Sequence, residues 1–257
     1  VMGVWTEGET QLVFIDTPGL IKPKNSLGDY MVKSVTSSVA DVDACLLVVE
    51  ANTKISKADE ELVHRFKDLG VPALLAINKI DLLQDKSVLM EQIAKLSALY
   101  DFEAVVPVSA QDGNGMDALR EELIALAEPG GHFFSEDTLT DQPERAIVAE
   151  IIREKALHAL DDEIPHGIAV CIDRMKQRKG QNIMDIEATI VCERDSHKGI
   201  VIGKGGAMLK KIGSNARYEI ERLLEEQVNL KLWVKVKKDW RDSDSMMKNF
   251  GYNKDEI

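Results

Sequence analysis

The stretch PALLAINKID, residues 72–81, decides how the first half of the chain folds. All residues from Ala73 to Ile77 are apolar, which is typical of a strand buried on both faces of a parallel sheet. Three polar side chains follow directly, those of Asn78, Lys79 and Asp81. Because open α/β sheets bind ligands at the carboxyl ends of their strands, we expect these three residues to line a binding site.

Three further apolar runs surround this stretch and also end in polar residues. They are QLVFID at residues 11–16, ACLLVVEA at 44–51 and AVVPVSA at 104–110, with helical stretches between them. Strands that alternate with helices predict an α/β domain with a mostly parallel sheet, which we place at residues 1–128. Asp16 and Ser109 then lie at the carboxyl ends of strands, as Asn78 does.

The second half of the chain follows a different order. Residues 129–145 combine paired glycines, prolines and many acids, which predicts a linker between domains. After the linker we expect a helix at 146–160, strands at 167–175 and 183–192, a glycine loop, a helix at 208–227 and a strand at 230–236. Helices and strands segregated in this way predict a small α+β domain over residues 146–257.

Charge is distributed unevenly along the chain. The formal net charge is −12, yet eleven Lys or Arg outnumber six acids between Asp195 and Arg241. A positive segment in an acidic chain is expected when one part of a protein meets a polyanion and the rest stays soluble.

The cysteines and the hydropathy narrow the class of protein. Cys45, Cys171 and Cys192 are far apart, each inside an apolar run, which argues against a disulfide framework or a metal site and favours a reduced, cytosolic compartment. No apolar stretch approaches the roughly 20 residues that a membrane span needs.

The tetrapeptide Asp16-Thr17-Pro18-Gly19 follows its apolar run directly. A carboxylate at this place can hold Mg²⁺ through water, and Gly19 lets a backbone N–H group approach a terminal phosphate. The same residues would also suit an ordinary turn at the end of a strand.

The residue types at 78–81 suit guanine. The Asp81 carboxylate can accept hydrogen bonds from N1 and N2 of guanine, a pattern that adenine cannot offer. Lys79 would pack over the base and Asn78 would brace neighbouring loops, while a backbone amide at Ser109-Ala110 would reach guanine O6. Each element alone could be a helix cap or a turn, but their order at successive strand ends is the one that a guanine-nucleotide site requires.

This arrangement resembles the translation-factor-related GTPases, with their P-loop-type fold. The resemblance implies a magnesium and γ-phosphate switch in which Asp16 holds Mg²⁺ through water, and it implies GTP and GDP as ligands. The nucleotide-binding residues that it predicts are Asp16, Thr17, Pro18, Gly19, Asn78, Lys79, Asp81, Ser109 and Ala110.

The chain departs from that family in two ways. It contains no G-x-x-x-x-G-K-[S/T] phosphate loop, so the first strand and the phosphate loop of the pattern are missing. We therefore expect an N-terminally truncated piece of a longer protein, which binds GTP weakly or not at all and is inactive by itself. Leu20 stands where Ras-like enzymes place a water-orienting Gln, so we assign no catalytic residue and expect slow hydrolysis in a complete protein.

The run HKGIVIGKGG, residues 197–206, ends in a tetrad that fits the GxxG loop of KH domains, which clamps a short single-stranded RNA backbone. The tetrad alone would also suit a flexible turn, but it joins two helices, which disfavours a dinucleotide-binding fingerprint. We expect lysines to meet phosphates and apolar residues to give a floor for unstacked bases. The predicted RNA-binding residues are Lys198, Ile200, Val201, Ile202, Gly203, Lys204, Gly205, Gly206, Lys210 and Lys211.

The order of elements around this loop resembles a type II KH domain. Residues 140–170, 193–213 (ERDSHKGIVIGKGGAMLKKIG) and 232–241 (LWVKVKKDWR) are similar to the linker and KH domain of the Era family of bacterial GTPases. The resemblance covers nearly the whole chain. It implies a cytoplasmic monomer that binds the 3′ end of small-subunit ribosomal RNA, assists small ribosomal subunit assembly and makes the peripheral membrane contact known for some members.

The sequence also allows a second function for the chain. The chain would instead be a non-catalytic RNA-binding module if its first half were a nucleotide-free scaffold. Trp5, Trp233 and Trp240 are all expected to be packing residues, and Trp240 is the best exception for stacking on a base because basic residues surround it.

Overall fold

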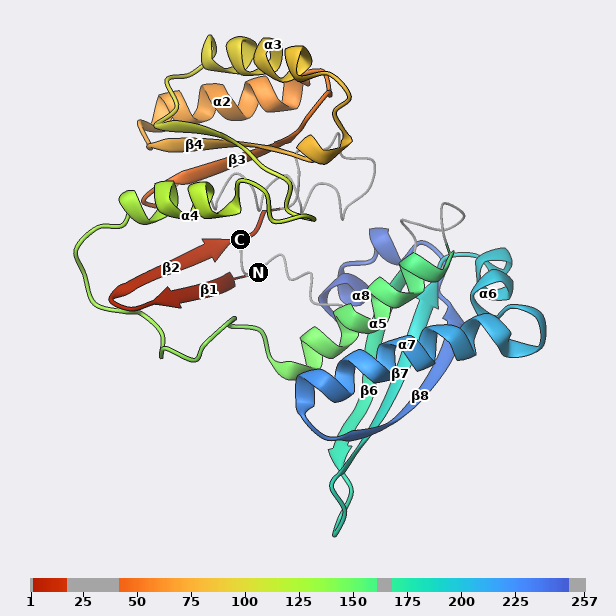
Figure 1. Cartoon of the computed structure of the whole chain (residues 1–257). Helices are drawn as coiled ribbons and strands as arrows, with labels where there is room; N and C mark the ends of the chain where they lie inside the picture. The colour runs from red at the N-terminus through yellow and green to blue at the C-terminus, as the bar shows by residue number, and fades with distance from the viewer. Residues whose placement is uncertain (1, 18–41, 161–167, 250–257) are drawn as a thin grey trace. The chain divides into compact units, whose positions relative to one another are not determined.

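The computed structural model describes residues 2–17, 42–160 and 168–249. The chain divides into two compact units between Asp141 and Gln142 (Figure 1).

The first unit contains the predicted parallel sheet. Its described strands are β3 (Cys45–Glu50), β4 (Ala73–Asn78) and β5 (Ala104–Pro107), with β4 in the centre. The backbone and side chains of β4 are buried from Ala73 to Ile77, as the unbroken apolar run predicts. A parallel α/β sheet is therefore confirmed for this part of the chain.

Helices cover both faces of this sheet. They are α2 (Lys57–Leu69), α3 (Lys86–Ser97) and α4 (Met116–Ala125), and a short 3₁₀ helix η1 (Ile80–Leu82) follows β4. Side chains of α2 and α3 share a core with Leu75 and Ile77, whereas α4 packs on the other face beside Ala76. The alternate side chains of β4 thus serve two different cores, which explains why the residues from Ala73 to Ile77 are all apolar.

The first apolar run differs from the expectation. It forms β2 (Thr10–Ile15), which pairs antiparallel with β1 (Met2–Glu7) and is not bonded to the parallel sheet among the described residues. A two-residue turn at Gly8 and Glu9 joins the strands, and Gly8 has the positive φ of 58° that such turns favour. Closing so short a loop costs little entropy, so the local partner is favoured.

Residues 132–141, within the stretch expected to be a linker, lie against this hairpin. The Val4 backbone N–H donates to Leu139 O at 2.8 Å, and the Thr140 hydroxyl donates to Met2 O at 2.6 Å. The Gln11 side chain accepts from the backbone N–H groups of Phe133 and Phe134 at 2.9 and 3.0 Å. This part of the stretch is therefore ordered by hydrogen bonds to β1 and β2.

The second unit has the predicted α+β order. Its elements are α5 (Glu144–Leu160), β6 (Ile168–Gln177), β7 (Ile183–Cys192), α6 (Asp195–Ile202), η3 (Lys204–Gly206), α7 (Ala207–Leu224), β8 (Gln227–Val236), η4 (Trp240–Asp242) and α8 (Asp244–Asn249). The sheet order is β6-β7-β8, with β6 antiparallel and β8 parallel to the central β7. Alternate side chains of the strands, such as Ile186 and Ile190, pack with α5 and α7 in one core.

The opposite face of the sheet is partly covered by the C-terminal elements. Trp240 of η4 and Met247 of α8 cluster with Ala169 and Val191, and Trp240 is only 2% exposed. Trp240 therefore packs, as expected for the tryptophans in general, and it is not the exception that its basic neighbours suggested, because its ring is buried.

Candidate functional site

The carboxyl end of β4 is held together by the side chain of Asn78. Its Oδ1 atom accepts hydrogen bonds from the backbone N–H groups of Lys79 at 2.8 Å and Ala110 at 3.0 Å. The backbone of Ile80 also donates to Val108 O at 3.2 Å. The loops after β4 and β5 are thus tied at one edge of the sheet, and residues that are 32 positions apart in sequence are brought together.

Lys79 adopts a left-handed backbone conformation with a φ of 64°. A non-glycine residue is uncommon there and pays a conformational cost, which points to a local constraint. The Lys79 ammonium lies 2.9 Å from the Glu50 carboxylate at the end of β3, and both side chains are about half exposed. This ion pair links the ends of β3 and β4 across the same edge of the sheet.

Asp81 lies in η1 just beyond this turn and is exposed. Its carboxylate makes no hydrogen bond or ion pair with another residue among those that the structure describes. The carboxylate can therefore accept two hydrogen bonds from a ligand without first breaking an internal contact.

The loop after β5 has a rigid base and an exposed end. Ser109 is 1% exposed, and its backbone N–H donates to Asn114 O at 2.8 Å. A Cβ atom at Gly115, where φ is 76°, would lie 2.3 Å from Pro107 O, so this loop closes only over a glycine. Ala110 is exposed, and its amide nitrogen is turned towards the Asn78 side chain.

Gln92 of α3 supports this edge and was not found from the sequence. Its amide nitrogen donates to Glu50 O at 2.9 Å, while its oxygen accepts from the Asn52 backbone N–H at 3.1 Å. The side chain is 6% exposed. Only a contact across 42 positions reveals this role, since a glutamine in an amphipathic helix carries no local signal.

The predicted phosphate switch is described only in part. Asp16 is exposed directly after β2, and Thr17 is half-buried. Pro18, Gly19 and Leu20 lie outside the described residues. Among the residues that the structure describes, no group of three His, Cys, Asp or Glu side chains could hold a metal ion by itself. An exposed carboxylate still suits Mg²⁺, which keeps several waters and is bound with one or two carboxylates plus phosphate oxygens.

In the second unit, the glycine tetrad forms the turn between α6 and α7. Gly203 has a φ of 71° and a ψ of 174°, a combination that is essentially restricted to glycine. A Cβ atom at Gly203 would lie 2.7 Å from Met208 Cβ, whereas one at Gly205 would meet no atom within 4 Å. The backbone of the loop is therefore fixed at its start by Gly203 and is open at Gly205.

The lysines predicted for this site surround the turn. Lys204 is exposed within the loop, and Lys210 and Lys211 are exposed in the first turns of α7. Lys198 on α6 is half-buried. No described residue forms an ion pair with these four ammonium groups, so their positive charge is not neutralised locally.

The predicted apolar floor is corrected at one position. Val201 is 0% exposed and belongs to the main core of the unit, whereas its neighbours Ile200 and Ile202 are half-buried at the edge of that core. Successive helical residues point about 100° apart, so three consecutive side chains cannot all face a ligand. Ile200 and Ile202 remain available, and Val201 is a packing residue.

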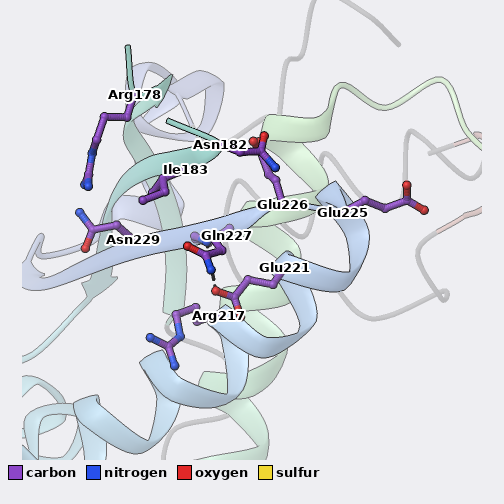
Figure 2. A pocket seen from close by; sticks show the side chains of 10 residues that line it. Arg178, Asn182, Ile183, Arg217, Glu221, Glu225, Glu226, Gln227 and Asn229 are labelled. Atoms are coloured by element: carbon purple, nitrogen blue, oxygen red, sulfur yellow. Dashed lines mark hydrogen bonds between the residues drawn. The ribbon is translucent and has the colours of Figure 1, made fainter. Parts of the chain in front are cut away.

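A polar hollow of about 740 Å³ lies at the far end of α7, away from the tetrad (Figure 2). Its walls mix charges of both signs, including Arg178 and Arg217 against Glu221 and Glu226. The Glu221 carboxylate already accepts a hydrogen bond from the Val228 backbone N–H, at 3.0 Å. The hollow contains no residue predicted for either site, and its mixed charge favours neither a polyanion nor a polycation.

Two family models match the chain. One, described as the Elongation factor Tu GTP binding domain, matches residues 5–129, and the other, described as a KH domain, matches residues 163–241. The first matches the unit with the Asn78 and Asp81 site, and the second contains the glycine tetrad. In the described residues no helix is both long enough and apolar enough to pass through a bilayer.

Curated relatives resemble the chain over nearly its whole length. It is 50% identical over 252 residues to the GTPase Era of Ruminiclostridium cellulolyticum, covering 98% of this chain and 84% of the relative. It is 47% identical over 253 residues to the GTPase Era of Clostridioides difficile, covering 98% and 85%.

Two solved structures share the fold at 36% identity. A variant of Aquifex aeolicus Era bound to GDP and AlF4⁻ superposes with a TM-score of 0.91, covering 98% of this chain and 86% of that one. Era in complex with MgGDPNP and nucleotides 1506–1542 of 16S ribosomal RNA superposes with a TM-score of 0.92, covering 98% and 85%.

Proposed function

We propose that this chain, which belongs to the Era family of GTPases, is a guanine-nucleotide switch that binds the 3′ end of small-subunit ribosomal RNA and assists small ribosomal subunit assembly. The single observation that carries the nucleotide half is the pair of hydrogen bonds at Asn78 Oδ1, at 2.8 and 3.0 Å, beside the uncommitted Asp81 carboxylate. Such an edge offers guanine an uncommitted acceptor on a turn that is held in place by hydrogen bonds.

Each nucleotide-binding residue then has a role. Asp81 accepts from guanine N1 and N2, the stem of Lys79 covers the base, and the loop at Ser109 and Ala110 approaches O6. The Lys79 ion pair with Glu50 and the Gln92 contacts keep that edge in place before nucleotide arrives. Related Era structures with GDP and AlF4⁻ or with MgGDPNP support GTP, GDP and Mg²⁺ as the ligands.

The phosphates and the metal belong to the other part of the pocket. Asp16 would hold Mg²⁺ through water, and residues Thr17 to Gly19 would contact the γ-phosphate. Bound Mg²⁺ neutralises phosphate charge during hydrolysis. With Leu20 in place of a water-orienting polar side chain, we propose that the complete protein hydrolyses GTP to GDP and phosphate slowly.

The sheet also has a place for a further strand. Val48 on β3 is 55% exposed, and no described strand pairs with the outer edge of β3. An exposed apolar strand edge readily takes another strand. We propose that this edge of β3 pairs with a further strand of the GTPase domain.

The RNA half rests on the glycine tetrad and its lysines. Close backbone approach at Gly205 and the positive charges of Lys204, Lys210 and Lys211 suit a ribose-phosphate chain, and Ile200 and Ile202 suit unstacked bases. The related Era complex with nucleotides 1506–1542 of 16S ribosomal RNA supports small-subunit ribosomal RNA as the partner.

The two halves would act as one switch. GTP and Mg²⁺ would order the segment after Asp16, which would change the packing of the linker and expose or cover the RNA cleft. We further propose a cytoplasmic monomer, with membrane contact limited to the peripheral kind.

A second candidate is an RNA-binding module with a nucleotide-free first unit. It is favoured by one observation, the lack of a G-x-x-x-x-G-K-[S/T] pattern in the sequence. Nucleotide binding by the full-length protein separates the two candidates.

Two variants of the full-length protein test the assignment. Asp81→Ala should abolish the preference for guanine over adenine nucleotides and leave RNA affinity in the absence of nucleotide unchanged. Lys204→Ala combined with Gly205→Asp should do the reverse, because an acid placed against phosphate is repulsive. Normal RNA affinity in the double variant would overturn the clamp assignment.

A further inference from the structure

The three-stranded sheet of the second unit has one face that the main core does not use. Along β8, the residues Val228, Leu230, Leu232 and Val234 pack with the helices. The alternate residues point to the opposite face, because successive side chains of a strand alternate. On β8 these are Asn229, Lys231, Trp233 and Lys235.

Trp233 lies on this face on the edge strand β8. It is 43% exposed, although Trp240, at the other end of the same basic segment, is 2% exposed. In register it lies beside Thr189 of β7, which lies beside Cys171 of β6. The Thr189 side chain is buried at 3% exposed, whereas the indole ring of Trp233 is accessible to solvent.

Lysines flank this tryptophan on the same strand. Lys231 and Lys235 are exposed, two positions to either side of Trp233, and no described residue forms an ion pair or a side-chain hydrogen bond with them. Steps of two residues along a strand are about 6.8 Å, so the three side chains form a line about 14 Å long. The line consists of a cation, an aromatic ring and a cation.

Two acids of β7 lie on this face: Asp185 is paired with other groups, and Glu187 is the cross-strand neighbour of Lys231. Asp185 accepts from Arg178 Nε at 3.0 Å and from Asn229 at 2.7 Å, and Glu187 lies 4.0 Å from Arg174. The exposed acid that remains, Asp173, is on the far strand β6 and accepts from the Thr189 hydroxyl at 2.6 Å.

The charge without a local partner is therefore positive, and it is greatest along β8. The described C-terminal elements cover the end of this face at Ala169 and Val191, and within the described residues Trp233 is 43% exposed.

The Lys235 end of this line of residues lies towards the end of β8 that neighbours the start of α6. β7 and β8 run parallel with Cys192 beside Val236, and the Lys237 backbone N–H donates to Cys192 O at 2.8 Å. α6 starts three residues after Cys192 and is about 12 Å long, and it ends at the loop. The loop belongs to the helical side of the sheet, and β8 is an edge of the described sheet, so RNA would pass this edge to reach the outer face.

We propose that the outer face of β8 is a second subsite for single-stranded RNA, in which a base stacks on Trp233 and the flanking phosphates lie against Lys231 and Lys235. Sheet faces that carry exposed aromatic residues bind single strands in this way in other folds, because every base has a face that stacks. Charge complementarity selects a polyanion over an apolar partner. The inference rests on the proposed RNA binding by the glycine loop, whose RNA it extends.

The test compares two RNAs from the 3′ end of small-subunit ribosomal RNA. One has about four nucleotides, the length that a GxxG loop clamps, and the other has about 12. Trp233→Leu should weaken binding of the longer RNA by roughly 5-fold to 150-fold and change binding of the shorter RNA by less than about 2-fold. Trp233→Phe, which keeps a stacking ring, should retain part of the affinity.

A charge variant provides a readout that does not depend on the tryptophan. Lys231→Gln with Lys235→Gln should lower the slope of log affinity against log salt for the longer RNA by about 1.4, or about 0.7 for each lost phosphate contact. Lys57→Gln with Lys67→Gln on α2 removes the same charge from exposed positions of the first unit and should leave the slope unchanged.

The outcomes separate this inference from the function on which it rests. Wild-type affinity of Trp233→Leu for the longer RNA, or an unchanged salt slope in the Lys231 and Lys235 variant, would overturn the second subsite while the loop still binds. If Trp233→Leu no longer folds, as judged by thermal unfolding, the lysine variant decides alone. Failure of the short RNA to bind wild-type protein would instead overturn the loop assignment.

Discussion

Replacing Gly203 by Ala should damage the RNA loop far more than replacing Gly205, two positions later. Both glycines have positive φ, 71° at Gly203 and 60° at Gly205. At Gly205 the ψ of 21° is ordinary left-handed helix, which an alanine can adopt at a cost. At Gly203 the ψ of 174° places the residue in a region that only glycine occupies readily.

The magnitude follows from the surroundings of each Cβ atom. Alanine at 203 would lie 2.7 Å from Met208 Cβ and 2.9 Å from Met208 N, so the first turn of α7 would have to move. Backbone strain of ~1–3 kcal/mol and overpacking of ~1–3 kcal/mol give a loss of about 2–6 kcal/mol. At Gly205, with no atom within 4 Å, only about 1–2 kcal/mol of backbone cost remains.

Urea unfolding measures the difference directly. In a Trp5→Phe background the tryptophan fluorescence comes from Trp233 and Trp240, which both belong to the second unit. The entropy that alanine removes from the unfolded chain is the same at both positions and cancels in the comparison. If Gly203→Ala is no less stable than Gly205→Ala, the account of the loop geometry is refuted.

Three further predictions concern other parts of the chain. Asn78→Ala leaves two backbone N–H groups without their acceptor and should cost about 1–3 kcal/mol in urea unfolding of the first unit, whereas Asn78→Asp keeps an acceptor oxygen and serves as its control. The hydrogen bonds from Arg178 lower the pKa of Asp185 from 3.8 to about 2, so its contribution to stability is present above about pH 4 and is lost as the pH falls towards 2; Asp185→Asn should remove that dependence from an acid unfolding series. Burial raises the pKa of Cys192 to about 11, so in native protein at pH 8 it should react with iodoacetamide much more slowly than the less buried Cys171, and equal rates by mass spectrometry would contradict the packing.

Runs of apolar residues predicted the strands well because burial on both faces leaves no room for polar side chains. β4 lies where its apolar run predicts, and its polar end marks the edge of the sheet that Asn78 ties together. The partner of β2 was not predictable in the same way. The pattern of a strand indicates which face is buried but not which neighbour pairs with it, and a two-residue turn at Gly8 supplied the antiparallel one.

The roles of single residues depended on distant contacts. Val201 belongs to an apolar run that suggests a floor, yet the helical rotation directs it into the core. Trp240 and Trp233 lie in the same basic segment, and only the packing of α8 on the sheet and the alternation along β8 show which indole is covered. Gln92 and the ion pair between Lys79 and Glu50 likewise join residues that are far apart in sequence.

A guanine-selective pocket and an RNA clamp in one chain are expected to control each other. The most direct measurement is the affinity of the full-length protein for RNA from the 3′ end of the small-subunit ribosomal RNA, taken at fixed salt with Mg²⁺ and either GDP or a non-hydrolysable GTP analogue. Coupling of the usual size predicts affinities that differ by roughly 5-fold to 150-fold between the two nucleotides. Equal affinities, with both nucleotides bound, would contradict it.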